Sequence, residues 1–355
     1  GADETAVDAL LDQTGTTSSG GSTYNLAAAD NWLNAADAAT DISDAVNAVT
    51  VSINPRITSA TYDASSGSLA VTGTNLQANG SGADIDASKF TLTGEGGSTY
   101  TLTDSADVEI SSSTAFTITL SATDKAAINQ IANKNGTAST GDTTYNLAAA
   151  DDWSTNATTG DTADTTGNGI TVSNVATPAI TSATYNAGTG ALAVTGAGFL
   201  KLNGATNDID ASKFTFTGEG GDTYTLTDSA DVEITSGTAF TVTLSSTDKA
   251  AVNQIVNKNG TASTGGTTYN LAAAEDWAAG ASAAVAVADL TGNGITASSV
   301  AAPAITSAAY NTGTGALTVT GSGFLKASGA INDIDASAFT FTGEGGGTYT
   351  LTDTA

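Results

Sequence analysis

The sequence predicts an all-β protein built of tandem immunoglobulin-like β-sandwich domains, each carrying one short helix. Its first support is repetition, because residues 84–153 recur almost unchanged at 208–277, 124 positions later. Its second support is a pattern of short runs in which apolar and polar residues alternate between turns rich in Gly, Asn and Asp. Each repeat holds about seven or eight such runs, a number typical of an immunoglobulin-like sandwich.

The period of 124 residues also sets the domain organisation. It is too long for one unit of a solenoid and fits one small domain per repeat. The beginning of the repeat returns near the C-terminus, and its end appears near the N-terminus as TYNLAAADNW. We therefore expect the second half of a repeat at residues 1–56, complete repeats at 57–179 and 180–304, and the first half of a repeat at 305–355.

One short helix is expected in each repeat, because Ala127, Ile128 and Ile131 follow the i, i+3, i+4 spacing of an amphipathic helix. Thr123 or Asp124 is the expected N-cap. A glycine at position 136 is the expected stop at the C-terminal end. The same pattern returns in the second complete repeat, at Ala251, Val252 and Ile255. A more apolar form of it occurs near the N-terminus, at Val7, Leu10 and Leu11.

The expected strands follow from alternation and turn residues. ITSATYNAGTGALAVTGAGF (180–199) predicts a hairpin that turns at NAGTG. KFTFTGEGGDTYTLTD (213–228) predicts a second hairpin that turns at GEGG, and DVEITSGTAFTVTLS (231–245) a third. TYNLAAADDW (144–153) predicts a short extended segment, and GITVSNV (169–175) a further strand. The inward-facing candidates of the second hairpin are Phe214, Phe216, Tyr224 and Leu226.

The three prolines occupy one fixed place, two residues before each ITSA motif. Because proline cannot donate a hydrogen bond to a central ladder, this place predicts an inter-domain linker or the start of an edge strand. The prolines are Pro55, Pro178 and Pro303.

The composition excludes several classes of function. With 36 acidic and 9 basic residues the net charge is −27, so the surface repels nucleic acids and anionic membranes. Cysteine and histidine are absent, which removes thiolates and imidazoles from any catalytic or metal-binding role. The chain has no apolar run of about 18 residues, and no membrane span is expected. The absence of methionine indicates a processed chain or a fragment.

The candidate metal site is a pair of carboxylates at i and i+2 in the DIDAS motif. Oxygens from such a turn resemble the ligands of a hard cation, so Ca²⁺ is the expected metal. The alternative is an Asx turn or a cap before the following ASKF segment. The proposed ligands are Asp84, Asp86, Asp208, Asp210, Asp333 and Asp335, with the GEGG glutamates Glu95, Glu219 and Glu344. Further oxygens are available from Asp104, Asp228 and Asp353.

Two other patterns carry weaker chemical hypotheses. Acidic residues precede each tryptophan, as Asp30 precedes Trp32, and a carbohydrate site often pairs carboxylates with an exposed aromatic ring. The structural alternative is a tryptophan that fills the domain core, and it is favoured. Lys89 and Lys213 suggest an internal Lys–Asn isopeptide bond, which we discount because the third copy has Ala338 there.

The chain begins and ends inside a repeat, since Gly1 aligns with Ser246 and Ala355 with Ala230. Only the segment equivalent to residues 231–245 lies between that end and that beginning. A partial domain would expose strand edges and an unfinished core. Either the sequence is a window of a longer array, or the two partial repeats complete one another between chains, head to tail.

Four motifs resemble the repeats of very large bacterial extracellular proteins. They are ITSATYNAGTGALAVTGAGF, NDIDASKFTFTGEGG, TYTLTDSADVEIT and the NKNGTAST segment that precedes TYNLAAADDW or TYNLAAAEDW. The resemblance covers essentially the whole chain and is to type I-secreted, RTX-like adhesins and to S-layer or matrix-filament proteins. It implies export to the extracellular space or cell surface, a role as stalk, sheath or lattice, and often dependence on Ca²⁺.

The expected function is that of a non-catalytic structural protein of the bacterial cell surface, whose repeats assemble into an extracellular fibre, sheath or lattice. Other copies of the chain are the expected partners, with a surface polysaccharide as a further candidate. The alternative is the stalk of a large secreted adhesin. An enzyme acting on polysaccharide is disfavoured, because the acidic residues recur in every copy whereas an active site is unique.

Overall fold

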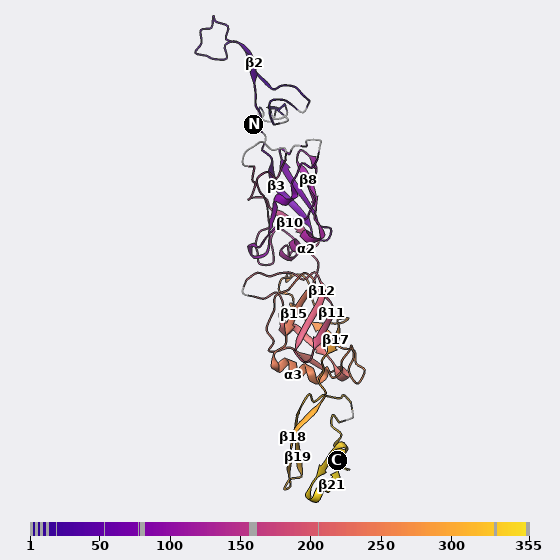
Figure 1. The fold of residues 1–355 in the computed structure, drawn as a ribbon. Helices are drawn as coiled ribbons and strands as arrows, with labels where there is room; N and C mark the ends of the chain where they lie inside the picture. Colours follow the sequence, from indigo (N-terminus) through magenta and orange to yellow (C-terminus); the bar gives the residue numbers. More distant parts are fainter. Residues whose placement is uncertain are drawn as a thin grey trace. The chain divides into compact units, whose positions relative to one another are not determined.

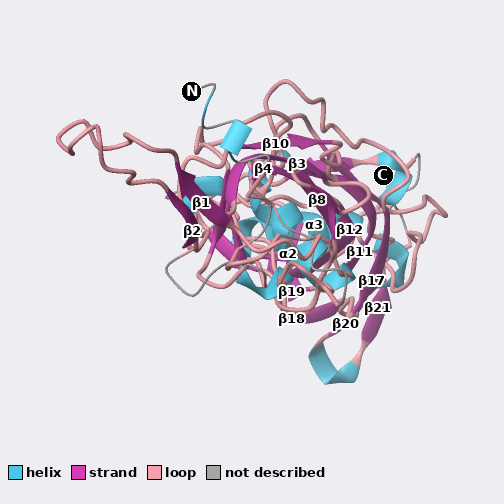
Figure 2. Ribbon diagram, turned by 90° about the horizontal axis from the view of Figure 1, so that it is seen from above, coloured by secondary structure: helices cyan, strands magenta, loops and turns pink. Residues whose placement is uncertain are grey.

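The computed structural model describes residues 3, 6–7, 10–11, 14–18, 20–52, 54–76, 78, 82–155, 162–204, 206–329 and 332–352. In this part of the chain strands far outnumber helices, as the magenta and cyan segments of Figure 2 show. The predicted all-β class is confirmed at this level. Two compact units make up the chain, Gly1–Val175 and Ala176–Ala355.

The first complete repeat contains eight strands and one α-helix in its described residues. The strands are β3 (Arg56–Asp63), β4 (Ser68–Thr74), β5 (Phe90–Thr93), β6 (Thr99–Thr101), β7 (Ile110–Ser112), β8 (Ala115–Thr119), β9 (Asn146–Ala149) and β10 (Ile170–Ser173). The helix α2 (Ala122–Ile131) follows β8, and Figure 1 labels it together with β3, β8 and β10. The hairpins expected from the alternation are therefore present.

Two sheets face one core in this repeat. One sheet has the order β10-β3-β4-β8-β7, and the other has the order β6-β5-β9. β10 pairs parallel with β3, with Val172 opposite Tyr62, whereas β3, β4 and β8 pair antiparallel. A single bridge between Asn146 and Gly169 links β9 to the segment entering β10. The buried side chains of both sheets form one cluster.

The second complete repeat has the same strand order, except that the hairpin predicted at residues 231–245 supplies only one strand and a single bridge between Ser236 and Ala239. Its strands are β11 (Ala179–Asn186), β12 (Ala191–Ala197), β13 (Phe214–Thr217), β14 (Thr223–Thr225), β15 (Ala239–Thr243), β16 (Asn270–Ala273) and β17 (Gly294–Ser298), with α3 (Ser246–Ile255) after β15. They form one sheet of order β14-β13-β16-β17-β11-β12-β15, in which β15 is an edge. The pairing of Asn270 with Gly294 joins β16 to β17, whose counterparts in the first complete repeat lie in two separate sheets.

Aromatic side chains fill the centre of each core. Trp277 is fully buried, with ring centroids 5.6 Å from Phe199, 5.8 Å from Phe214 and 6.0 Å from Phe240. Trp153 occupies the equivalent place in the first complete repeat. The favoured structural role of these two tryptophans is therefore confirmed. The predicted inward side chains Phe214, Phe216 and Leu226 are also buried, and Tyr224 is half-buried.

The helix boundaries differ from those expected. Helix α2 begins at Ala122, because Ser121 is the N-cap and its Oγ accepts a hydrogen bond from the Asp124 amide at 3.0 Å. The predicted caps Thr123 and Asp124 thus lie inside the first turn. The helix ends at Ile131, well before Gly136, and its last turn carries the buried side chains of Ile128 and Ile131. In the N-terminal copy, Val7 is helical but 48% exposed.

The prolines precede strands, but those strands are not edges. β3 and β11 begin at the residue after Pro55 and Pro178, and each has neighbours on both sides. The edge-strand interpretation is therefore wrong for these two copies. Proline is tolerated because it stands just outside the ladder, where no amide is needed.

Both partial repeats retain strands of the complete ones. The N-terminal partial repeat has β1 (Asn25–Ala28) and β2 (Asp44–Ala48), which pair antiparallel. The C-terminal partial repeat has β18 (Ala304–Asn311), β19 (Ala316–Ser322), β20 (Thr340–Thr342) and β21 (Thr348–Thr350), in two hairpins.

Candidate functional site

The second carboxylate of each DIDAS motif caps a short 3-10 helix. These helices are η1 (Ala87–Lys89), η3 (Ala211–Lys213) and η5 (Ala336–Ala338), and their N-caps are Asp86, Asp210 and Asp335. Asp210, for example, accepts from the Ser212 amide at 2.9 Å and the Ser212 hydroxyl at 2.6 Å. For the second carboxylate of the motif, the structure therefore shows the cap that was predicted as the alternative to a metal site.

The first carboxylate of the motif is buried in the complete repeats. Asp208 is fully buried and accepts hydrogen bonds from the backbone amides of Leu202 and Ile234. Asp84 is equally buried and accepts from the Ile110 amide at 3.0 Å. In the C-terminal partial repeat, by contrast, Asp333 is exposed. The buried carboxylates hold neighbouring loops to the motif, since a buried charge is stable only when it is hydrogen-bonded.

A glutamate that sequence reasoning did not single out lies beside each buried aspartate. The pKa of Glu233 is raised because its carboxyl forms a side-chain hydrogen bond with Asp208. The pKa of Glu109 is raised for the same reason beside Asp84. Both glutamates belong to the DVEI motif, which the sequence pattern marked only as a strand.

The structure does not gather the predicted metal ligands into one site. Glu95 and Glu219 lie in another network, described below, and the Asp104 and Asp228 amides donate to Asp124 and Asp248. Glu344 opens the turn η6 (Glu344–Gly346), and Asp353 lies outside the described residues. Within the described residues, no group of three or more acidic side chains is placed to hold a metal ion. Binding of Ca²⁺ stays a prediction.

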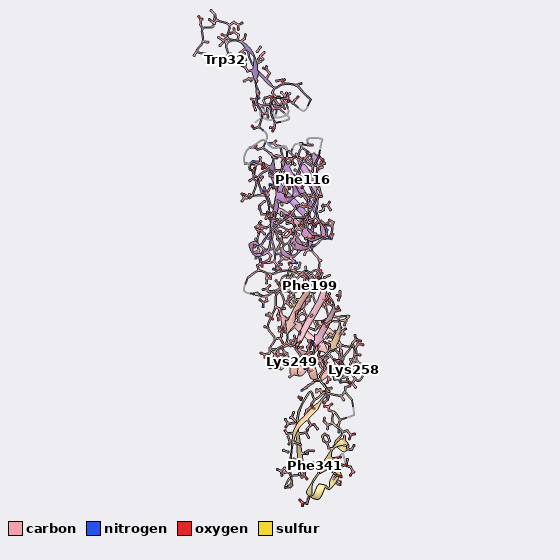
Figure 3. The ribbon with its side chains drawn as sticks, in the orientation of Figure 1. Trp32, Phe116, Phe199, Lys249, Lys258 and Phe341 are labelled. Atoms are coloured by element: carbon pink, nitrogen blue, oxygen red, sulfur yellow. The ribbon has the colours of Figure 1, made fainter. Side chains whose placement is uncertain are left out.

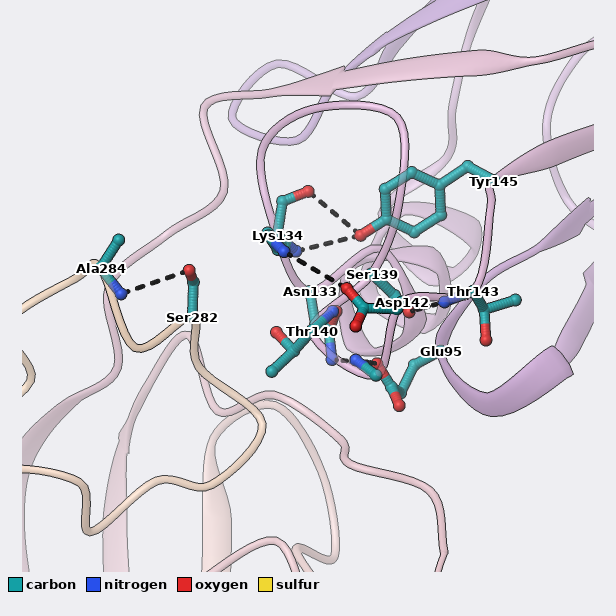
Figure 4. A network of polar contacts seen from close by, with 11 residues as sticks. Glu95, Asn133, Lys134, Ser139, Thr140, Asp142, Thr143, Tyr145, Ser282 and Ala284 are labelled. Atoms are coloured by element: carbon teal, nitrogen blue, oxygen red, sulfur yellow. Dashed lines mark hydrogen bonds and ion pairs between the residues drawn. The ribbon is translucent and has the colours of Figure 1, made fainter.

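The glutamate of the GEGG turn organises the end of each complete repeat where the helix stops. In the first complete repeat Glu95 accepts from the Asn133 side chain at 3.0 Å and from the Gly141 amide at 2.8 Å. Figure 4 shows this network together with Tyr145, whose hydroxyl donates to the Lys134 carbonyl at 3.0 Å. The Glu95 carboxylate leaves no space for a side chain at position 141.

In the second complete repeat the same network also holds the following partial repeat. The Ser328 hydroxyl donates to Glu219 at 3.0 Å. The Lys326 amide donates to the Gln254 carbonyl at 3.1 Å. The Lys326 carbonyl in turn accepts from the Asn257 side chain at 2.9 Å, so that residue 326 is held through both of its backbone groups. We call the Glu219, Gln254 and Asn257 contacts with residues 326–328 the junction site.

The junction site leaves no room for a side chain on Gly220. This glycine has a φ of 63°, and a Cβ there would overlap the Ser328 side chain. Gly345, in the equivalent turn of the C-terminal partial repeat, has a φ of 65° and nothing within 4 Å of a Cβ. The two glycines therefore share a backbone conformation but differ in their surroundings.

We expect Gly220→Ala to release residues 326–328 from the junction site, whereas Gly345→Ala should not. Both changes carry the same backbone cost of about 1 kcal/mol, since alanine disfavours positive φ. Hydrogen exchange at the Lys326 amide measures the difference, because that amide donates to Gln254. Equal protection of this amide in the two variants would contradict the prediction.

The pH dependence of the junction site follows from Glu219. Its pKa is lowered to about 2, mainly by the hydrogen bond from the Gly265 amide, with further donation from Asn257 and Ser328. Because the folded pKa lies below the ordinary value of 4.5, the stabilisation is complete above that value and is lost as the pH falls toward 2. Ser328 resonances in NMR spectra should shift over this range, and Glu219→Gln should abolish the shift. A Ser328 titration unchanged by Glu219→Gln would contradict this assignment.

A second buried carboxylate occupies the start of each α-helix. Asp248 accepts from the Tyr224 and Ser229 hydroxyls at 2.9 and 2.6 Å, and from the Thr227 hydroxyl at 3.1 Å. It also accepts from the backbone amides of residues 227–229. Donation from the Ser229 side chain and these amides holds the pKa of Asp248 far below its ordinary value, although burial opposes the shift. Asp124 has the same role in the first complete repeat.

The acidic residue before each tryptophan closes a loop. Glu275 accepts from the Val287 amide at 2.8 Å, while the Trp277 indole donates to the Val287 carbonyl at 2.7 Å. In the N-terminal partial repeat, Asp30 and Trp32 make the same two bonds to Ile42. The first complete repeat has the equivalent pair of bonds to residue 162, so the loop is closed in the same way in all three copies. Buried Trp153 and Trp277 present no exposed ring for a sugar.

Large apolar side chains are exposed on both partial repeats. The N-terminal open face consists of Leu26, Trp32, Leu33 and Val46, and the C-terminal open face consists of Ile305, Tyr310, Phe324, Ile334 and Tyr349. Trp32 is 60% exposed, whereas Trp153 and Trp277 are fully buried. Figure 3 labels Trp32 in the N-terminal partial repeat and Phe341 in the C-terminal partial repeat.

A hollow on the C-terminal open face has a volume of about 340 Å³. It is lined by Tyr310, Gly315, Leu317, Phe341, Tyr349 and Leu351. The equivalent positions of the second complete repeat include Tyr185, Leu192, Phe216 and Leu226, which are buried. Other parts of the repeat therefore cover this surface in a complete domain.

Comparison with known proteins assigns no family to the chain: no protein-family model matches it, and no curated protein matches it. Among the described residues, no helix has both the length and the apolar character needed to cross a membrane.

Proposed function

We propose that this protein is a non-catalytic structural protein of the bacterial cell surface. Its tandem repeats assemble into an extracellular fibre, sheath or lattice. The observation that carries the proposal is the repetition of one complete fold, in which the recurring polar groups of each copy form hydrogen bonds within that copy or to the repeat that follows. Glu219 and Asp248 bind backbone amides and neighbouring side chains, as do Glu95 and Asp124 in the other copy. Such groups stabilise a building block and do not form a reactive centre.

The domain architecture belonging to this proposal is immunoglobulin-like. The support is the strand order, in which the first strand of a complete repeat pairs antiparallel with the second and parallel with the last, as β11 does with β12 and β17. The first strand of the second hairpin, β13, pairs with β16, which adjoins that last strand. These pairings support an immunoglobulin-like arrangement of the strands around one core.

Calcium belongs to the proposal as the metal that a strongly acidic extracellular array would bind. The pair formed by Asp208 and Glu233 is the most suitable starting point, because two carboxyls meet there. Binding of Ca²⁺ should lower the pKa of Glu233, because a nearby cation favours the charged carboxylate. Calorimetric titration of the chain with Ca²⁺, beside its Glu233→Gln variant, tests this point; equal heats from both proteins would exclude the pair.

The second candidate function is the stalk of a large secreted adhesin. The junction site favours it, since a stalk requires each domain to be fixed to the next, and Glu219 and Asn257 hold residues of the following repeat. In a stalk, recognition of a cell or a surface polysaccharide would depend on other domains.

Electron microscopy of the purified chain, with Ca²⁺ and after chelation, distinguishes the two functions. A structural subunit should form ordered filaments or sheets, and Ca²⁺-dependent assembly should disappear on chelation. Separate particles under both conditions would reject self-assembly and leave the adhesin stalk as the better interpretation.

A further inference from the structure

The NKNGTAST motif contains an asparagine that has no part in the networks of buried carboxylates. Asn135 and Asn259 each begin the sequence Asn-Gly-Thr, in the loop that follows the α-helix of each complete repeat. Asparagine followed two positions later by serine or threonine is the acceptor sequence for N-linked sugars on the surface of exported proteins. Two further acceptor sequences, at Asn79 and Asn156, lie outside the described residues. Whether such an asparagine can accept a sugar depends on how the fold presents its side-chain nitrogen.

Both asparagines are exposed, and each side chain is anchored through its oxygen alone. Oδ1 of Asn135 accepts a hydrogen bond from the Val175 amide at 3.0 Å, and Oδ1 of Asn259 accepts from the Val300 amide at 2.9 Å. Because the donor is a backbone amide, the atom that it contacts must be the oxygen of the side chain. Within the described residues, neither Nδ2 atom donates a hydrogen bond. The nitrogen that would accept a sugar is therefore free, while the side chain is held in place.

Most other asparagines of the complete repeats use this nitrogen internally. Nδ2 of Asn253, for example, donates to the Ala187 carbonyl at 3.0 Å. The same use is made of Asn129, Asn133, Asn146, Asn168, Asn257, Asn270 and Asn293. Asn186 is bonded through its oxygen, but glycine follows it two positions later, so it is not in an acceptor sequence. Within the described residues, a free Nδ2 and an acceptor sequence coincide at Asn135 and Asn259.

The rest of each acceptor sequence is equally accessible. Thr137 and Thr261 are exposed, and within the described residues their hydroxyls make no hydrogen bond. The intervening glycines, Gly136 and Gly260, have φ values of 115° and 111°, and nothing lies within 4 Å of a Cβ built on either of them. A transferase can therefore approach these three residues without obstruction by the rest of the repeat.

We propose that Asn135 and Asn259 are glycosylated on Nδ2. The donor is a sugar activated as a diphosphate ester, and a glycosyltransferase catalyses the transfer. A bond forms between Nδ2 and the anomeric carbon of the sugar, while the bond from that carbon to the diphosphate oxygen breaks. The diphosphate leaves with the bonding electrons, and the proton lost from Nδ2 passes to a base of the transferase. This modification goes beyond the proposed structural role and does not depend on self-assembly.

The fold restrains the competing reaction of an Asn-Gly sequence, which is deamidation. In that reaction the glycine nitrogen attacks the side-chain carbonyl carbon of the asparagine and ammonia is lost. The Gly260 amide, however, donates to the Ala297 carbonyl at 2.9 Å, and the side-chain oxygen of the asparagine is held by Val300. The Gly136 amide is held by the Val172 carbonyl in the same way, at 2.8 Å. Because these hydrogen bonds must break before the ring can close, the side-chain amide is preserved for transfer of a sugar.

The second proposed site lies beside the linker to the following repeat. Val300, whose amide donates to Asn259, belongs to residues 299–303, which connect β17 to β18. Ser299 and residues 301–303 are exposed. A sugar on Asn259 places a bulky, hydrophilic group next to this segment. Such a group would limit the access of proteases, which preferentially cut exposed connecting segments of small residues.

Mass spectrometry of the protein isolated from the cells that produce it tests the proposal. Cleavage after lysine and before aspartate releases residues 135–141 and 259–275, each beginning with one of the two asparagines. Both peptides should carry the added mass of a sugar, and electron-transfer fragmentation should place it on the asparagine. A single sugar would indicate a nucleotide-linked donor, and a uniform oligosaccharide would indicate a lipid-linked donor. Both outcomes would support the proposal.

Two substitutions of Thr261, expressed in the same cells, are the matched controls. Thr261→Ala removes the acceptor sequence but keeps Asn259 and its hydrogen bond with Val300, whereas Thr261→Ser keeps the sequence as well. We expect the peptide 259–275 to lose its sugar completely in Thr261→Ala and to retain it in Thr261→Ser. The peptide 135–141 should stay modified in both variants, which makes it an internal control for the transferase.

The outcomes separate this inference from the proposed function. Peptides without a sugar, or with only the small mass gain of deamidation, would overturn the proposal and leave the structural role standing. A sugar that persists on residues 259–275 in Thr261→Ala, or that fragmentation places on a threonine or serine, would also overturn N-linked transfer. Glycosylated chains that never assemble would support this inference and reject self-assembly.

Discussion

Replacing Trp277 by alanine is expected to destabilise the second complete repeat by about 3–5 kcal/mol, the usual cost of deleting a fully buried tryptophan. The indole lies among Phe199, Phe214 and Phe240, and its nitrogen donates to the Val287 carbonyl. Its removal leaves a cavity at the centre of the core and an acceptor without its donor. Hydrogen exchange of peptides from residues 180–304 should report the loss as faster exchange of the protected strands.

Trp32→Ala is the matched control, because the same TYNLAAA motif precedes it and the same indole bond is present. Since Trp32 is 60% exposed, its removal should leave the exchange of residues 57–304 unchanged. Comparable loss of stability in both variants would show that burial does not determine the effect.

Asp248→Ala is expected to cost about 3–5 kcal/mol as well, because several buried donors lose a charged acceptor at once. The hydroxyls of Tyr224 and Ser229 and three backbone amides converge on this carboxylate. Without it the start of α3 separates from the loop after β14. Urea unfolding followed by tryptophan fluorescence should show a transition at lower urea concentration.

The control for this prediction is Asp210→Ala, which removes another aspartate that is only half-buried. Asp210 caps one short 3-10 helix through Ser212, and its loss should cost about 1 kcal/mol. A cost for Asp248→Ala no greater than that for Asp210→Ala would contradict the importance of the converging donors.

Sequence reasoning placed the strands well where local pattern determines them. The hairpins of β11 with β12 and of β13 with β14 fall where alternation and the glycine turns predicted. The helix start was misplaced because Thr123 and Asp124 are acceptable caps by residue type, whereas Ser121 is the one with the required backbone conformation. The motif Ser-x-x-Asp from Ser121 to Asp124 was the signal that could have corrected it.

Sequence reasoning was least informative about the carboxylates. Residue type alone suggested that the DIDAS and GEGG acids act together, but Asp208 and Glu219 belong to different networks. Asp124 was predicted only as a possible helix cap, and Asp248 was not singled out. Their donors come from a loop about 20 residues earlier in the chain. A carboxylate's role depends on which donors surround it, and those donors are brought together only by folding.

The sequence by itself determined the repeat, the hairpins, the strong negative charge and the absence of thiol and imidazole chemistry, because each is a property of composition or of local spacing. Only the tertiary structure decided that β11 lies between β12 and β17, which are far apart in sequence, and therefore that Pro178 precedes an interior strand. It also decided which copy of the tryptophan is buried. Identical motifs differ in exposure because burial depends on whether the remaining strands of the same domain are present to cover them.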